Sequence, residues 1–143
     1  MGLDPAVWGP HYWFLLHTIS LNYPKYPSSV TKKKYYEFIH NLHLFIPIEQ
    51  MAGDFSKLLD QYPVAPYLDS RDSFIRWMHF IHNKINEKLE KPKISLSQFY
   101  TQYYDAYKPK NVKIAEYYQL KKKAIYFGIV FLIGGGIYFL YDK

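Results

Sequence analysis

The chain has 143 residues, of which 49% are apolar and 21% are charged, and this favours one small domain with a sizeable core. Its formal net charge is +6, but no nucleic-acid-binding motif accompanies the lysines, so nucleic acid is not an expected partner. The sequence contains no cysteine, which excludes disulfides, thiolate metal ligands and cysteine nucleophiles from this chain.

The first predicted element is a helix beginning at Asp4-Pro5, because Asp caps free amide groups and Pro fits a first helical turn. Apolar residues at helical spacing predict a core-facing stripe, formed by Trp8, Tyr12, Leu15, Leu16 and Ile19. An adjacent face carries Gly9, Trp13 and His17 at intervals of four residues. We expect the helix to end before Tyr23-Pro24, where proline restricts the preceding residue.

Two further helices are expected after a turn at residues 26–29. The second, from Thr31 to about Phe45, is predicted to bury Tyr35, Ile39, Leu42 and Phe45. His40 and His43 lie one turn apart in it, but a pair without a third nearby ligand does not predict a metal site. The third opens at Pro47 with a continuous inward stripe formed by Ile48, Met51, Ala52, Phe55, Leu58, Leu59 and Tyr62.

The segment Ser70–Pro92 predicts one long helix with two kinds of face. Its apolar stripe is expected in the core and consists of Phe74, Trp77, Met78, Ile81, Ile85 and Leu89. A polar flank beside the stripe consists of His79, His82, Asn83 and Asn86. These side chains need hydrogen-bond partners, which either other helices or a bound ligand would supply. The residues alone leave both alternatives open.

A short fifth helix is predicted after Ser95, which forms a capping-box pattern with Gln98. Five helices and no convincing strand predict an all-α fold, a four-helix bundle plus a short fifth helix. We assign residues 1–104 to this domain and residues 105–123 to a basic linker.

Residues 124–141, AIYFGIVFLIGGGIYFLY, are uncharged and predict a C-terminal transmembrane helix of about 27 Å. A buried core helix is the alternative, but we do not expect such a helix to be uncharged on every side. Lys121–Lys123 precede the segment, so the positive-inside rule predicts a single-pass membrane protein whose N-terminal domain is cytosolic.

Two separated motifs resemble those of the Erv/ALR family of FAD-linked sulfhydryl oxidases. The first is W-G-x3-W-x3-H-x6-P, at Trp8, Gly9, Trp13, His17 and Pro24. The second is W-x4-HN-x2-N-x4-KP, at Trp77, His82, Asn83, Asn86, Lys91 and Pro92. Two motifs in the family's order are more specific than either alone. The resemblance implies FAD held between helices, with candidate contacts at Gly9, Trp13, His17, Tyr23, Trp77, His82, Asn83, Asn86, Lys88 and Lys91.

The chain departs from the family pattern at the redox pair P-C-x2-C, where it has Ile48 and Met51. Neither side chain can take part in thiol–disulfide exchange, so no catalytic residue is predicted. Glu90 is a second departure, because it replaces the glycine of the usual L-G-K-P and would repel the FAD diphosphate unless it turns away.

The resemblance therefore implies a redox-inactive family member that serves as a structural or interaction module. The alternative is an FAD-dependent thiol oxidase whose active-site cysteines are substituted in this chain. Members commonly dimerise through their first helices, so a homodimer is expected beside the membrane contact. Small members in large DNA viruses act in virion assembly, and by this analogy the protein is expected in a virion inner membrane.

Overall fold

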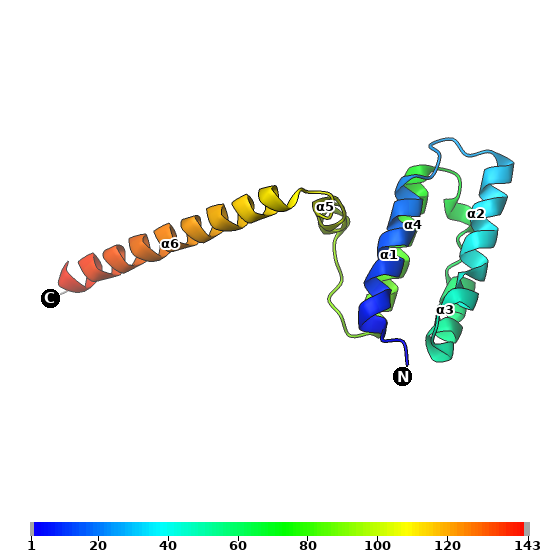
Figure 1. The fold of residues 1–143 in the computed structure, drawn as a ribbon, viewed down its shortest axis with the longest axis horizontal. Helices are drawn as coiled ribbons and strands as arrows, with labels where there is room; N and C mark the ends of the chain where they lie inside the picture. The colour runs from blue at the N-terminus through cyan, green and yellow to red at the C-terminus, as the bar shows by residue number, and fades with distance from the viewer. Residues whose placement is uncertain (1, 142–143) are drawn as a thin grey trace. The chain divides into compact units, whose positions relative to one another are not determined.

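All regular secondary structure in residues 2–141, which the computed structural model describes, is helical (Figure 1). Met1, the first residue of the predicted domain, lies outside the described residues. The chain forms two compact units, one ending at Tyr100 and the other beginning at Thr101. The first unit holds α1 (Pro5–Leu21), α2 (Ser29–Asn41), the 3-10 turn η1 (Leu42–Phe45), α3 (Glu49–Gln61), the 3-10 turn η2 (Ala65–Tyr67) and α4 (Arg71–Lys88). This arrangement, followed by the short α5 (Leu96–Asp105), confirms the predicted all-α fold.

Local capping explains where several helices begin. The Asp4 carboxylate accepts a hydrogen bond from the Ala6 amide at 2.8 Å, and Pro5 occupies the first turn of α1. Ser70 caps α4, and its hydroxyl accepts a hydrogen bond from the Ser73 amide at 3.2 Å. Ser95 and Gln98 form both bonds of a capping box at the start of α5, at 3.1 and 2.7 Å.

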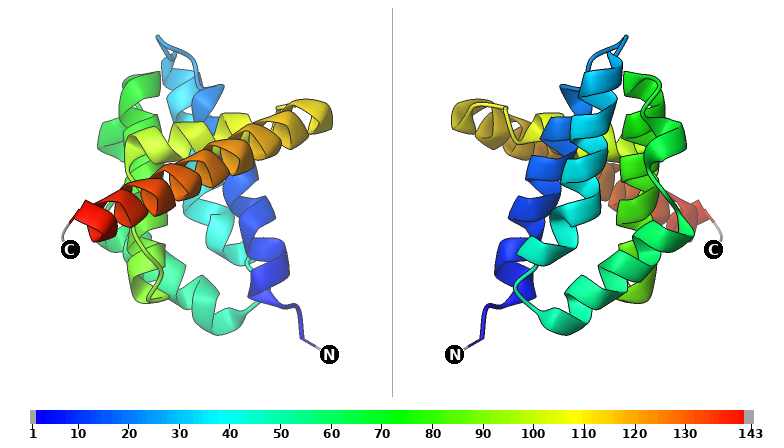
Figure 2. Two further views of the ribbon diagram at one scale, coloured as in Figure 1. Left: turned by 90° about the vertical axis from the view of Figure 1, so that its left-hand side faces the viewer. Right: turned by 90° about the vertical axis from the view of Figure 1, so that its right-hand side faces the viewer.

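The core of the first unit lies where α4 packs along α1 (Figure 1). Figure 2 shows α1 and α4 diverging toward the end of the unit where α3 lies. The buried cluster consists of Leu16, Tyr23, Ile39, Leu42, Phe55, Leu59, Val64, Leu68, Phe74, Trp77, Met78 and Ile81. Its polar groups are satisfied, since the Tyr23 hydroxyl donates to the Leu68 carbonyl at 2.8 Å and Trp77 Nε1–H donates to the Tyr62 carbonyl at 3.1 Å.

Three apolar residues predicted to be buried are exposed. Leu15 is 55% exposed because α1 turns Leu16, His17 and Ser20 inward instead. Phe45 is 65% exposed, since α2 ends at Asn41 and the 3-10 turn that follows breaks the helical spacing. The predicted helix to Pro92 is also too long, because α4 ends at Lys88 and leaves Leu89 outside it, 46% exposed.

The second unit contains α6 (Lys110–Tyr141), one unbroken helix of 32 residues. Most of the segment 105–123, predicted as a linker, is therefore helical. An 18-residue window of α6 has a mean hydropathy of 1.9 and none of it is buried. By length and composition, α6 could cross a membrane.

Candidate functional site

A cavity of about 540 Å³ lies between α1, α3 and α4 and is closed on one side by η1 and Ile46. This volume is within the range of small-molecule and cofactor sites. Most of its wall is apolar or aromatic and is formed by Pro5, Ala6, Trp8, Pro10, Tyr12, Leu16, Leu42, Ile46, Met51, Phe55, Ile85 and Leu89. The residues predicted as cofactor contacts that line it are Gly9, Trp13, His82, Asn86 and Lys91.

Helix α1 supplies one wall of the cavity. A Cβ atom added at Gly9 would meet no atom within 4 Å, so the missing side chain leaves open space there. The Trp8 and Tyr12 rings pack edge to face with centroids 5.0 Å apart. The Tyr12 hydroxyl then donates to the Phe45 carbonyl at 2.8 Å, which ties this wall to η1.

Trp13 and two histidines form a cluster between α1 and α4. The Trp13 ring stacks on the His82 ring, with centroids 4.0 Å apart and planes 11° from parallel. His82 Nδ1 lies 2.9 Å from His17 Nε2, so one nitrogen donates and the other accepts. The remaining nitrogen of His17, Nδ1, is buried and has no hydrogen-bond partner among the described residues.

The environment of these two imidazoles keeps them neutral. Burial, together with smaller effects of charge repulsion from His82 and His79, lowers the pKa of His17 to about 3. Burial also lowers the pKa of His82 to about 4, helped by His79 and Lys91. At neutral pH the pair is thus a hydrogen-bonding and stacking element and not a cationic one.

The end of α4 brings a cation to the cavity. Glu90 has a φ of 56°, and its amide donates to the Glu87 carbonyl at 3.2 Å. The Lys91 amide donates to the Asn86 carbonyl at 2.8 Å. These two bonds form a Schellman motif, with Glu90 in the position that glycine usually takes. The chain reverses there, so Lys91 lines the cavity beside Asn86.

Other predicted contacts lie away from the cavity wall. Tyr23 and Trp77 are core residues, and His17 lies behind His82. Asn83 bonds the backbone of Ile94, and Lys88 forms an ion pair with Asp54 at 2.8 Å. The amide and imidazole groups on the polar flank of α4 thus find many of their partners within the protein.

At the positions of the family's redox pair, the two substituted residues have different roles. Ile48 is the N-cap residue of α3 and lies outside the cavity wall, whereas Met51 lines it. Sequence reasoning missed the contribution of η1 and Phe55 to the wall. Phe55 and Leu42 were expected as core packing, and apolar periodicity does not distinguish a filled core from a cavity wall.

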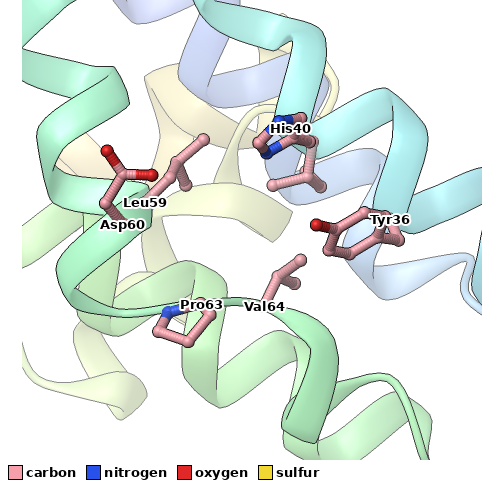
Figure 3. Close-up of a pocket in the computed structure, with 7 residues that line it drawn as sticks. Tyr36, His40, Leu59, Asp60, Pro63 and Val64 are labelled. Atoms are coloured by element: carbon pink, nitrogen blue, oxygen red, sulfur yellow. The ribbon is translucent and has the colours of Figure 1, made fainter.

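A smaller hollow of about 170 Å³ lies between α2 and α3. Figure 3 shows Tyr36 and His40 on its α2 side and Asp60 on its α3 side. The Tyr36 and His40 rings stack, with centroids 5.6 Å apart. No group of three His, Cys, Asp or Glu side chains placed to hold a metal ion is found within residues 2–141.

The sequence of this chain is similar to those of known sulfhydryl oxidases. It is 34% identical over 89 residues to the mitochondrial FAD-linked sulfhydryl oxidase erv1 of Schizosaccharomyces pombe, covering 62% of this chain and 49% of that protein. It is 29% identical over 85 residues to the probable FAD-linked sulfhydryl oxidase R368 of Acanthamoeba polyphaga mimivirus, covering 59% of each. The chain thus spans about half the length of the curated relatives that it matches.

The fold gives the same assignment. The structure matches the crystal structure of the FAD binding domain of Erv1 from Saccharomyces cerevisiae with a TM-score of 0.65 and 32% identity, covering 72% of this chain and 96% of that one. The crystal structure of the yeast Erv1 core matches with the same TM-score, 0.65, and 31% identity over 72% of this chain and 86% of that one. Residues 10–105 match the sequence pattern of the Erv1/Alr family. On these grounds the chain belongs to the Erv1/Alr family.

Proposed function

We propose that this protein is a membrane-anchored Erv1/Alr family member that binds FAD in the cavity between α1, α3 and α4 and serves as a structural or interaction module. The observation that carries the proposal is the cavity wall itself. It combines residues of both family motifs, including Trp13, His82 and Lys91, with Met51 at the position of a redox cysteine. The relatives described above are named as an FAD-linked and a probable FAD-linked sulfhydryl oxidase, and this supports FAD as the ligand.

The wall suits a ligand that is part planar ring and part anion. Trp8, Tyr12 and Trp13 supply aromatic surfaces, and Gly9 leaves room beside them. Lys91 supplies a cation that attracts phosphate oxygens, and the Asn86 amide can hydrogen-bond.

Bound FAD would supply a centre able to accept two electrons. Thiol substrates deliver electrons through a protein disulfide, and this chain has no cysteine to form one. Ile48 and Met51 carry no acidic thiol, so the α3 N-terminus has no thiolate to stabilise. We therefore propose that the protein retains the cofactor as part of its structure and does not oxidise thiols.

The location and assembly of the protein complete the proposal. We place α6 across a membrane with the N-terminal domain in the cytosol, as Lys121–Lys123 favour. The outward side of α1 exposes Val7, Phe14 and Leu15, and this supports a homodimer. A relative of this chain occurs in a mimivirus, and by analogy we also propose a site in a virion inner membrane and a role in virion assembly.

The first test is the absorption spectrum of the full chain purified in detergent. We expect a yellow protein. Its flavin absorption band should persist in the absence of oxygen after dithiothreitol is added, at a dithiothreitol concentration that does not reduce free FAD. A colourless protein that takes up no added FAD would contradict the cofactor assignment. Rapid bleaching of the band, with turnover when oxygen is restored, would contradict the redox-inactive assignment.

The second test restores the redox pair. The double variant Ile48→Cys/Met51→Cys should gain thiol oxidation, because the two sulfurs would lie at the start of α3 beside the cavity. The matched control Ile48→Ser/Met51→Ser should stay inactive. A folded, yellow cysteine variant without activity would show that the flavin ring does not lie near Met51.

The third test concerns the anchor. Deleting residues 124–143 should release the protein from membranes, since the first unit has its own buried core. A truncated protein that still floats with vesicles of neutral lipid would contradict the anchor.

A further inference from the structure

Asn83 joins α4 to the segment that follows it. Its Oδ1 accepts a hydrogen bond from the Ile94 amide at 3.0 Å, and its Nδ2 donates to the Ile94 carbonyl at 2.8 Å. The side chain thus pairs with both backbone groups of one residue, as a neighbouring strand would. His79 Nε2 lies 2.9 Å from the same carbonyl oxygen, but the Ile94 N–H depends on Asn83 alone among the described residues.

The segment between Leu89 and Ile94 is therefore fixed to α4 at both ends. At its start, the Schellman bond joins the Lys91 amide to the Asn86 carbonyl at 2.8 Å. At its end, Asn83 holds Ile94. Lys91 is exposed, its own amide makes the first attachment, and the second attachment is three residues further along the chain. Without the second attachment, the residues between Lys91 and Ile94 would regain backbone freedom, which ligand binding would have to remove again.

We propose that Asn83 is a positioning residue, which holds the segment 89–94 against α4 so that Lys91 is presented to the anionic part of a ligand in the cavity. This inference rests on the proposed FAD site. It differs from the direct cofactor contact that the family resemblance implies for Asn83. Both ends of the Asn83 amide are engaged by Ile94, and Asn83 is not part of the cavity wall.

A double-mutant cycle on the full chain tests the inference. The dissociation constant for FAD would be measured by fluorescence for the parent, Asn83→Ala, Lys91→Met and the double variant. In the background that retains Lys91, Asn83→Ala should weaken FAD binding about tenfold, because the segment that carries Lys91 is no longer held against α4 before FAD binds. It should have little further effect once Lys91 is Met, since nothing remains for it to position. Asn41→Ala is the matched control, because the Asn41 side-chain amide donates to the Glu37 carbonyl on its own helix and to no other group within residues 2–141.

A second measurement tests, without any cofactor, whether the hydrogen bonds between Asn83 and the Ile94 backbone hold the segment 89–94; we call this pair of bonds the clamp. Hydrogen exchange of the peptide covering residues 89–95 should speed up in Asn83→Ala and not in Asn41→Ala. The variant Ile94→Pro removes the N–H from the other side of the clamp and leaves α4 unchanged. It should reproduce the loss in FAD affinity. The inference therefore stays testable even if Asn83→Ala fails to fold.

The outcomes separate the two proposals. A parent that binds no FAD overturns the proposed function and this inference with it. A parent that binds FAD, but loses affinity equally on Asn83→Ala with Lys91 present or replaced, overturns only the positioning role and assigns Asn83 to a direct contact. Unchanged exchange of residues 89–95 would also overturn it.

Discussion

Glu90 is the only non-glycine residue with a positive φ, 56°, among residues 2–141. An L-residue in this left-handed conformation costs roughly 1–2 kcal/mol, which glycine avoids. Glycine also loses more backbone entropy on folding, by roughly 0.5–1 kcal/mol. We therefore expect Glu90→Gly to raise the free energy of unfolding by about 1 kcal/mol, measured by urea denaturation followed by circular dichroism.

Glu90→Ala separates the backbone effect from the loss of charge. Alanine retains a Cβ and thus the strain, so this control should leave stability close to that of the parent. Equal stabilisation by Ala and Gly would show that removal of the carboxylate, and not relief of the positive φ, is responsible.

His17 and His82 predict a loss of stability on mild acidification. Their pKa values in the folded protein, about 3 and about 4, lie below the ordinary value of 6.5. Above pH 6.5 both are neutral in either state and contribute nothing, whereas below it the unfolded chain binds protons that the folded protein does not. The free energy of unfolding should therefore fall by about 2–4 kcal/mol between pH 6.5 and 5 without added FAD, measured from urea midpoints.

Substitutions assign that acid sensitivity to the buried pair. His17→Gln removes one of the two titrating groups and should make the dependence on pH shallower in this range. His40→Gln, at an exposed position on α2, is the control and should retain the slope of the parent. A parent whose stability is constant from pH 6.5 to 5 would show that the imidazoles become protonated without opening the fold.

At the scale of elements, helix starts could be predicted from sequence because their signals are local. Asp4, Ser70 and Ser95 each cap within three residues of their own position. Helix ends were less predictable. The end of α4 depends on a left-handed Glu90, which apolar spacing cannot reveal. Phe45 was assigned to the core because its spacing continues that of α2, although the chain changes to a 3-10 turn.

The candidate site could be predicted only in part, for a related reason. The motifs name residues such as Trp13 and His82, and the structure brings these to one cavity. A motif does not state whether a polar side chain faces a ligand or a neighbouring segment. Asn83 bonds Ile94 beyond the end of its own helix, and Lys88 pairs with Asp54 on another helix, and no spacing rule encodes such tertiary contacts. That the residues lining the cavity contact flavin stays a prediction.

Two glycines offer a matched test of the cavity formed by α1, α3 and α4. A Cβ atom at Gly9 or Gly53 would meet no atom within 4 Å, but only Gly9 lines the cavity. Leucine is a better helix former than glycine, so neither substitution should weaken its helix. Gly9→Leu should fill the cavity and reduce FAD affinity more than tenfold, whereas Gly53→Leu should bind as the parent does. Equal FAD affinity in both variants would place the flavin elsewhere.

At the scale of the whole molecule, the continuous helix α6 joins two chemically different halves. Its C-terminal part is uncharged from Ala124 to Tyr141, and the part before it carries Lys121–Lys123. Lysines that flank a transmembrane segment favour the cytosolic side, and each contributes about 1 kcal/mol near an anionic leaflet. The apolar segment should therefore govern insertion, and the three lysines should govern orientation.

Replacing Lys121–Lys123 by Gln should leave the protein in the membrane but weaken its orientation bias. Protease added outside sealed vesicles with an exposed cytosolic face should digest the N-terminal domain of the parent completely and that of the variant only in part. Lys32–Lys34→Gln, an equal loss of charge on α2 of the first unit, is the control and should be digested like the parent. If the N-terminal domain of the parent resists the protease, the domain lies inside the vesicles, on the non-cytosolic side. Lys121–Lys123 would then also lie on the side that the positive-inside rule disfavours, and the cytosolic placement would be contradicted.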